Sequence, residues 1–318
     1  MKKNKALNTY RKRYIFIYGS IAWACIHFLV FWVGMNVGTI YNSFFTETVG
    51  GDLKPYGVEA YKEVFMTVFG QKSNGINDYH SILNTFSVFV LAIFINLPLT
   101  LLFSYMIFKK IKWYKVLRVG MYVPCVISVV VLCLFWRLMV SGTSSGSGSS
   151  IFALFDKMGY GNEEIIKNGL LTDASTAWPA IIIFSVWTGV NGNIIYFTSA
   201  MARLPGSVIE SASLDGASDM KQFFSIVIPM IWPVITTMSI TLIAGAINWF
   251  QPAQLIIGND MAATVHGGTM AWMIVSQIKG GKTVGFPAAF GVTIGVFGAI
   301  FITVFRKLME KIYEGVEY

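Results

Sequence analysis

The stretch "IESASLDGASDMKQFFSIVIP", Ile209 to Pro229, lies between two long apolar runs of a 318-residue chain. It brings together three acids, one lysine and one glycine, whereas the whole chain is 55% hydrophobic and only 13% charged. Soluble domains are about 25% charged, so this composition indicates a chain that is solvated largely by lipid. The stretch is therefore interpreted as a surface connection between two membrane-spanning segments.

Six apolar runs are long enough to cross a hydrocarbon core about 30 Å thick, which takes roughly 20 helical residues. Helices are expected, because lipid cannot satisfy open backbone groups and the runs are too long for barrel strands. The first run is also too long for a cleaved signal peptide, so it is expected to stay as a span. The sequence predicts an all-α membrane protein with six transmembrane helices over residues 14–39, 82–108, 119–140, 178–200, 231–250 and 287–305.

The basic residues set the orientation of these six helices. The segments on one side are 1–13, 109–118, 201–230 and 306–318, and they hold 16 of the 24 Lys and Arg but six of the 16 acids. Such an excess marks the cytoplasmic side of a membrane protein. Both termini are therefore expected in the cytoplasm, with residues 14–305 as a multi-pass domain of the cell membrane. The net charge of +8 is read as a topology signal and not as a nucleic-acid patch.

The opening stretch has the signals of two short helices joined by a turn. Ser207 and Glu210 form a capping-box pattern at the start of the first helix. Asp215 is expected to end that helix and to cap a second one that begins near Ala217. Gly216 allows the backbone to turn between the two helices. The local pattern predicts a short, exposed helix bent off the membrane surface; an interfacial helix that only closes a loop is the alternative.

The second of these helices is amphipathic. Met220, Phe223, Phe224 and Val227 recur at helical spacing and are expected to seat against the bundle. Pro229 marks the entry into the fifth span.

The same stretch resembles a family signature. The permease subunits of ABC importers carry E-A-A-x-x-x-G-x(9)-I-x-L-P, and sugar-importer permeases extend it to E-A-A-x-x-D-G-A-x(5)-F-x-x-I-x-x-P. The matching positions are Glu210, Ser211, Ala212, Asp215, Gly216, Ala217, Phe223, Ile226, Ile228 and Pro229. The departures are Ser211 for alanine and Ile228 for leucine. The chain is similar to carbohydrate permeases of the maltose- or glycerol-3-phosphate-importer type along most of its length.

The resemblance implies a type I ABC importer permease fold in which residues 205–229 carry a cytoplasmic coupling helix. That helix would sit in a cleft of a separate ATPase dimer, and the resemblance assigns Glu210, Ser211, Ala212, Asp215, Gly216, Ala217, Phe223 and Pro229 to the contact. Further implied partners are a second homologous permease in a heterodimer and an extracellular solute-binding protein. The chain itself would catalyse no reaction and bind no cofactor or metal, since ATP and Mg²⁺ belong to the ATPase.

Two clusters have the chemistry of a sugar pathway, because sugar sites combine aromatic faces with amide side chains. One cluster lies in "WTGVNGNIIY" and consists of Trp187, Asn191 and Asn193; the other lies in "NWFQPAQ" and consists of Asn248, Trp249, Gln251 and Gln254. Contacts between helices and an aromatic belt at the interface are the structural alternatives. Asn84 and Asn96 are expected to hold helices together.

Other functions are disfavoured. "SQIKGGKT" (Ser276–Thr283) nearly spells a phosphate-binding loop, but serine replaces its first glycine and no buried strand precedes it. The six predicted spans contain no Asp or Glu, which disfavours an ion-coupled carrier. A sugar or sugar derivative is the favoured cargo of an ATP-driven importer; polyamine, amino-acid or phosphonate import and a secondary carrier are the alternatives.

Overall fold

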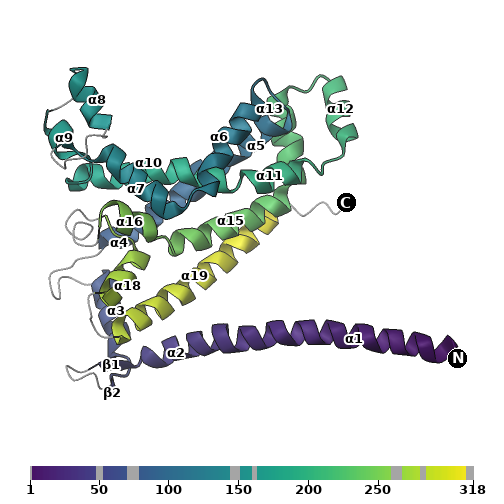
Figure 1. The fold of residues 1–318 in the computed structure, drawn as a ribbon, viewed down its shortest axis with the longest axis horizontal. Coiled ribbons are helices and arrows are strands. Elements are labelled where there is room, and N and C mark those ends of the chain that lie inside the picture. Colours follow the sequence, from purple (N-terminus) through teal and green to yellow (C-terminus); the bar gives the residue numbers. More distant parts are fainter. Residues whose placement is uncertain are drawn as a thin grey trace.

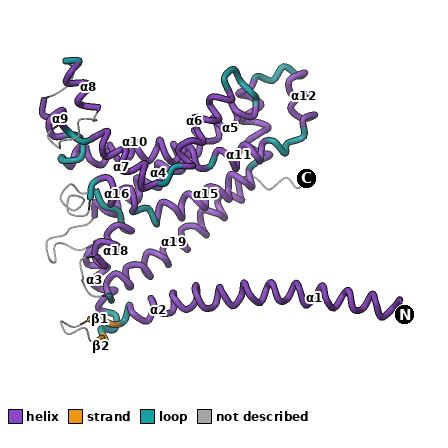
Figure 2. The backbone as a smooth tube through the Cα atoms, viewed as in Figure 1, coloured by secondary structure: helices purple, strands orange, loops and turns teal. Residues whose placement is uncertain are grey.

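The computed structural model describes residues 2–47, 53–69, 79–143, 151–159, 163–258, 267–279 and 284–312. Helices dominate this part of the chain, which confirms the predicted fold class (Figure 2). One small antiparallel hairpin departs from the all-α expectation. It pairs β1 (Phe45–Glu47) with β2 (Leu53–Pro55), and Thr46 lies opposite Lys54. Most of the serine- and glycine-rich stretch 141–150 lies outside the described residues.

Four of the six expected spans are continuous helical segments, some of them interrupted by a π-helical turn labelled η. In chain order, they are built from α1 (Lys2–His27), η1 (Phe28–Val33) and α2 (Gly34–Asn42); α4 (Tyr79–Leu91), η2 (Ala92–Asn96) and α5 (Leu97–Phe108); α10 (Ala174–Gly192) and α11 (Ile194–Met201); and α19 (Gly285–Ile312).

The third expected span is bent in its middle, which the apolar run did not predict. The third consists of α6 (Tyr114–Val126) and α7 (Val129–Val140), which meet at 102°. The two residues between them have extended backbone, and Pro124 inside α6 lacks the N–H that a helical bond needs. The fifth expected span, 231–250, corresponds to α15 (Trp232–Ile247), and the segment Asp219–Met230 that precedes it meets α15 at 77°.

The shorter helices lie at the two ends of the bundle. They are α3 (Glu59–Phe69), α8 (Ile151–Lys157), α9 (Glu163–Asn168), α12 (Gly206–Leu214), α16 (Gln251–Ile256) and α18 (Met270–Lys279). In Figure 1, α12 lies toward the same end as the start of α1 and the end of α19, whereas α8, α9, α16 and the hairpin lie toward the opposite end. Residues 276–279 of the near phosphate-loop sequence belong to helix α18, and 280–283 lie outside the described residues.

Buried amides join the second span to other elements. Asn84 Nδ2 donates to the carbonyl of Gly268 at 2.8 Å, and Asn96 Nδ2 donates to the carbonyl of Ser185 at 3.4 Å. Thr100 adds a bond to the carbonyl of Val190 at 3.0 Å. The prediction that Asn84 and Asn96 hold helices together is confirmed.

The first span is the exception to this packing. Its apolar window within residues 12–42 is 0% buried, and Figure 1 shows α1 extending away from the other helices. Its end, α2, meets the bundle at the start of α19, where Gly285 lies close to the carbonyls of Phe45 in β1 and Asn42 in α2.

The close approach of α10 to the second span generates a stability prediction. A Cβ on Gly189 would overlap the side-chain amide of Asn96, which is itself buried. Gly189→Ala should therefore force Asn96 away from Ser185 and lower the free energy of unfolding by about 1–3 kcal/mol. The measurement is the thermal unfolding midpoint of the purified protein in detergent.

Gly192→Ala is the matched control, because a Cβ at Gly192 meets no atom within 4 Å. Asn96→Ala combined with Gly189→Ala should recover much of the loss, since the overlapping group is gone. An equal loss with and without Asn96 would contradict this account.

Candidate functional site

The turn after α12 is a Schellman motif, a standard helix ending with a left-handed residue. Ala217 N–H donates to the carbonyl of Ala212 at 3.0 Å, and Gly216 N–H donates to that of Ser213 at 3.1 Å. Gly216 has φ +76°, in the left-handed region that favours glycine. Asp215 is the C-cap residue. The predicted helix end and the turning role of Gly216 are confirmed.

The first helix begins just after Pro205, but the predicted caps of both helices were wrong. Pro205 occupies the N-cap of α12 and Ser207 lies inside the helix, so the capping box with Glu210 does not form. The second helix begins at Asp219, and its cap is Ser218, whose hydroxyl accepts from the backbone N–H of Lys221 at 3.3 Å. Asp215 does not serve as this cap, because the backbone bonds of the Schellman turn place it at the end of α12.

Only two of the four apolar side chains that were expected to pack against the bundle, on the second helix, are buried. This helix runs through α13 (Asp219–Gln222), the π-helical turn η4 (Phe223–Val227) and α14 (Ile228–Met230), which contains Pro229. Phe223 and Val227 are buried against Tyr105 and other residues of the inner core, whereas Met220 and Phe224 are exposed. The π-helical turn rotates side chains away from a regular α-helical stripe, which the sequence pattern had assumed.

A polar cluster ties this turn to the end of α5. Lys109 Nζ lies 2.8 Å from a carboxylate oxygen of Asp219 and donates to Gln222 Oε1 at 2.7 Å. Gln222 Nε2 donates to the carbonyl of Ala217 at 2.8 Å. Burial disfavours the charged form of Lys109, but the hydrogen bond to Asp219 and the nearby Tyr105 outweigh it and raise the pKa of Lys109. Lys109 therefore remains charged at neutral pH.

The outer side of α12 offers an uncovered surface. Leu214 is 88% exposed at the end of the helix, and Glu210 and Ser211 are also exposed. Ala212 is buried against the protein, so it is not free for an outside contact. The matched motif therefore has two kinds of position. Glu210, Ser211, Asp215 and Gly216 are exposed, whereas Ala212 and Phe223 are buried.

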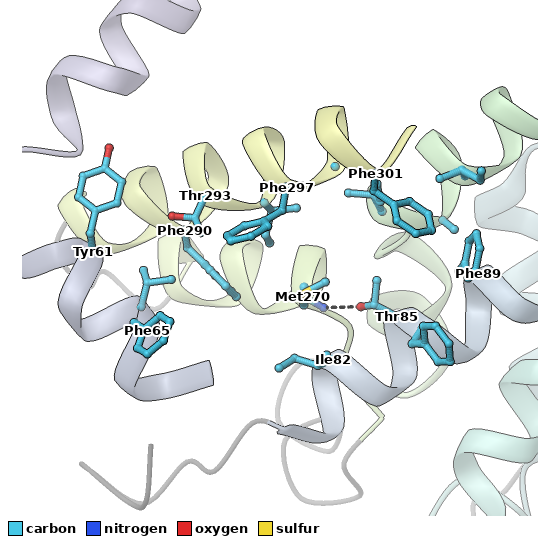
Figure 3. Close-up of a pocket in the computed structure, with 17 residues that line it drawn as sticks. Tyr61, Phe65, Ile82, Thr85, Phe89, Met270, Phe290, Thr293, Phe297 and Phe301 are labelled. Carbon is cyan, nitrogen blue, oxygen red and sulfur yellow. Dashed lines mark hydrogen bonds between the residues drawn. The ribbon is translucent and has the colours of Figure 1, made fainter. Parts of the chain in front are cut away.

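One hollow of the described chain lies between α3, α4, α15, α18 and α19 and has a volume of about 570 Å³ (Figure 3). Its 17 lining residues are mostly aliphatic or aromatic and include no charged side chain. The hydroxyl of Thr85 accepts from the backbone N–H of Met270, and that of Thr293 donates to the carbonyl of Ala289. Its threonine hydroxyls are therefore occupied, and this hollow does not suit a hydroxyl-rich solute.

A smaller hollow of about 360 Å³ is lined by one amide, that of Asn191, among apolar residues and a glycine. Its residues come from α5, α6 and α10: Leu99, Phe103, Leu117, Gly120, Met121, Val186, Trp187, Val190 and Asn191. The Asn191 amide is held by a bond to the carbonyl of Trp187, one turn earlier. Trp187 stacks on Trp136 with ring centroids 6.1 Å apart. The structure thus brings together two of the predicted pathway residues.

The remaining pathway candidates lie elsewhere. Asn193 is at the junction of α10 and α11, outside the lining of this hollow. The second cluster lies where α15 gives way to α16: Asn248 is exposed and bonds the carbonyl of Ala244, and Trp249 packs edge-on against Trp178. Gln251 is exposed and Gln254 is half-buried on α16. The structure does not place the two clusters in one hollow.

Sequence reasoning missed the roles of Ser218, Lys109 and Gln222 at the turn. Gln222 is 2% exposed, and its signal was an amide directly before the apolar run "FFSIVI". In the sequence, Lys109 contributes only to the positive charge of the segment 109–118. Its contact depends on bringing α5 beside α13, which local spacing does not reveal.

These features define a polytopic, α-helical membrane protein with a protruding helix–turn–helix between its fourth and fifth spans. The chain belongs to the family of binding-protein-dependent transport system inner membrane components, whose model matches residues 66–314. The predicted family is confirmed.

Named relatives cover much of the chain at low identity. It is 22% identical over 271 residues to the arabinooligosaccharides transport system permease protein AraP of Bacillus subtilis (strain 168), covering 85% of this chain and 80% of that protein. It is 26% identical over 176 residues to the lactose transport system permease protein LacF of Rhizobium radiobacter, covering 54% of this chain and 56% of that protein.

The fold is shared with a solved transporter. A chain of the bacterial alginate ABC transporter, in complex with its alginate pentasaccharide-bound periplasmic protein, matches 96% of this chain and 98% of its own length with a TM-score of 0.73. The two sequences are 16% identical. The predicted type I permease fold is confirmed.

Proposed function

We propose that this chain is a permease subunit of an ATP-driven importer for a sugar or sugar derivative. The observation that carries the proposal is the turn after the protruding helix α12, where left-handed Gly216 belongs to the family signature and the neighbouring Leu214 is 88% exposed. The named relatives AraP and LacF, which transport sugars by their descriptions, support the substrate class.

The proposed function includes three kinds of partner protein. The described residues include no nucleotide-binding loop, so ATP hydrolysis is assigned to a separate ATPase dimer that holds ATP and Mg²⁺ and receives α12. A second homologous permease completes the pathway, and an extracellular solute-binding protein delivers the sugar to the end with α8, α9 and α16. The chain itself is non-catalytic.

The smaller hollow is proposed as part of the sugar pathway. Trp187 offers a flat face for the CH groups of a sugar, and Asn191 offers a fixed amide for a hydroxyl. The cluster Asn248, Trp249, Gln251 and Gln254 is proposed to line the outer approach, and Asn193 to flank the hollow. Import of another small polar solute remains the second candidate, since amides and aromatic rings bind many such ligands.

The proposal is tested most directly by assembly and stimulation. The chain, its second permease and the ATPase should purify together, and ATP hydrolysis should rise when the binding protein is added with the correct sugar. Arabino-oligosaccharides, lactose and alginate oligosaccharides are the first probes. An uptake that follows a proton or sodium gradient and ignores the ATPase would indicate a secondary carrier instead.

The first prediction from the proposed function concerns membrane topology. In a chain whose Cys25, Cys125 and Cys133 are replaced by serine, Lys54→Cys and Thr172→Cys should react with an impermeant thiol reagent added to intact cells. Ser218→Cys should react only after permeabilisation, because the basic residues predict the turn to be cytoplasmic. Labelling of Ser218→Cys in sealed cells would reverse the orientation.

Gly216 provides the second. Its φ of +76° penalises β-branched residues, while a Cβ there meets no atom of the described chain within 4 Å. Gly216→Val should distort the turn, weaken ATPase retention and lower uptake about tenfold, a loss of about 1.4 kcal/mol in coupling. Gly216→Asn should be much milder, since asparagine tolerates this region.

The contrast between valine and asparagine isolates backbone conformation from side-chain size. Glu210→Ala should act in the same direction as Gly216→Val but less strongly, through loss of an exposed contact. If Gly216→Val keeps its ATPase and transports normally, α12 is not the coupling helix.

The third prediction from the proposed function concerns Asn191 in the smaller hollow. Asn191→Ala should raise the sugar concentration for half-maximal uptake about fivefold to tenfold, because a lost hydrogen bond is worth about 1 kcal/mol. ATPase retention should not change. Asn36→Ala is the matched control, since Asn36 makes the same bond to a tryptophan carbonyl one turn earlier but lies on the exposed first span. Equal effects of the two variants would remove Asn191 from the pathway.

A further inference from the structure

The α12–α13 turn is fastened to the second span as well as to its own neighbours in the chain. We define the Lys109 cluster as Lys109, Asp219 and Gln222, joined by the contacts of 2.8 Å and 2.7 Å from Lys109 Nζ. Lys109 is the residue directly after α5, and Tyr105 of α5 also donates to the backbone carbonyl of Asp219 at 3.0 Å. Three separate bonds therefore run between α5 and α13.

The Lys109 cluster needs, at position 222, a side chain that both accepts and donates hydrogen bonds, and the amide of Gln222 does both. Lysine can only donate and the carbonyl of Ala217 can only accept, so the side chain between them must accept on one side and donate on the other. Gln222 Nε2 also donates to the hydroxyl of Ser213, at 3.2 Å, which lies within α12 itself. The buried amide of Gln222 thus connects α12, the turn and α5 in one network.

The covalent route from α12 toward the fifth span is less direct. It passes through the π-helical turn η4 and then the 77° bend before α15. Such features are where helices commonly bend. The Lys109 cluster gives α12 a second connection, to a helix whose residues Leu99 and Phe103 line the smaller hollow.

We propose that Lys109 and Gln222 are positioning residues that carry the movement of α12 into α5 and so to the hollow lined by Phe103. This inference depends on the proposed function, in which an ATPase moves α12. The cluster is a transmission contact and not a docking contact, because Gln222 is buried and Lys109 points its amine at Asp219 and Gln222.

The test measures the hollow directly and needs no sugar. Phe103→Cys is introduced into the assembled complex of this chain, its second permease and the ATPase, with Cys25, Cys125 and Cys133 replaced by serine. The rate of labelling by N-ethylmaleimide is compared without nucleotide and with Mg-ATP and vanadate. With the Lys109 cluster intact, ATP should change this rate about tenfold, as expected for a coupling of about one decade.

Lys109→Met should reduce that change to less than about twofold while ATP hydrolysis and ATPase retention persist, since the contact and not the docking surface is lost. Gln222→Leu should do the same, and the double variant should be no worse than either, because one network is broken in each case. Lys109→Arg should restore most of the response. Lys112→Met is the matched control: Lys112 is exposed, makes no ion pair with any described residue and should behave as the unsubstituted chain.

Asp219→Asn serves as a second variant, because the Asp219 side chain is 73% exposed and its replacement should not disturb folding. It should reduce the ATP response about threefold, as expected for a partly exposed charge pair. An unchanged response in Lys109→Met, or loss of the ATPase from it, overturns the inference. Failure of the unsubstituted chain to retain an ATPase at all would instead overturn the proposed function.

Discussion

Hydrocarbon offers no hydrogen-bond partners, so most polar side chains inside this bundle bond to other groups of the protein. Thr100 shows the pattern: its hydroxyl meets the carbonyl of Asn96 on its own helix and that of Val190 on α10. Asn84 reaches Gly268 in the same way. These bonds fix which helices lie together, and apolar packing fills the space between them. The polar residues inside the spans are thus mainly contacts between helices, which leaves few candidates for a solute.

The sequence predicted the helical elements well, because lipid imposes a length that apolar composition reveals directly. The second expected span, 82–108, closely matches the observed segment Tyr79–Phe108. It did not predict the bends, since Ile127 and Ser128 are apolar or neutral and continue the pattern while their backbone is extended. Hydropathy indicates which residues lie in lipid, but it does not indicate a change in the direction of the helix axis.

In the candidate site, too, some residues could be predicted from the sequence and others could not. Gly216 was identifiable because a left-handed turn requires one residue type more than any other. Ser218 was not, since several polar residues in "DGAS" could have capped the next helix. The role of Gln222 was hidden because its partner Lys109 lies 113 residues earlier in the chain. Residues that satisfy a local conformational demand can be predicted, whereas residues that satisfy a tertiary contact cannot.

The isolated first span has a consequence for how the chain meets its bilayer. The helix from Lys2 to Asn42 carries an apolar run over residues 14–39, or about 39 Å of length, against a hydrocarbon core of about 30 Å. A helix with this hydrophobic mismatch tilts, and ordinarily its packing against neighbours limits the angle. Over most of its length this one has no neighbour among the described residues. Membrane thickness and the basic residues near its start, Lys12 and Arg13, would then govern its tilt in the isolated chain, so lipid composition becomes a determinant of its geometry.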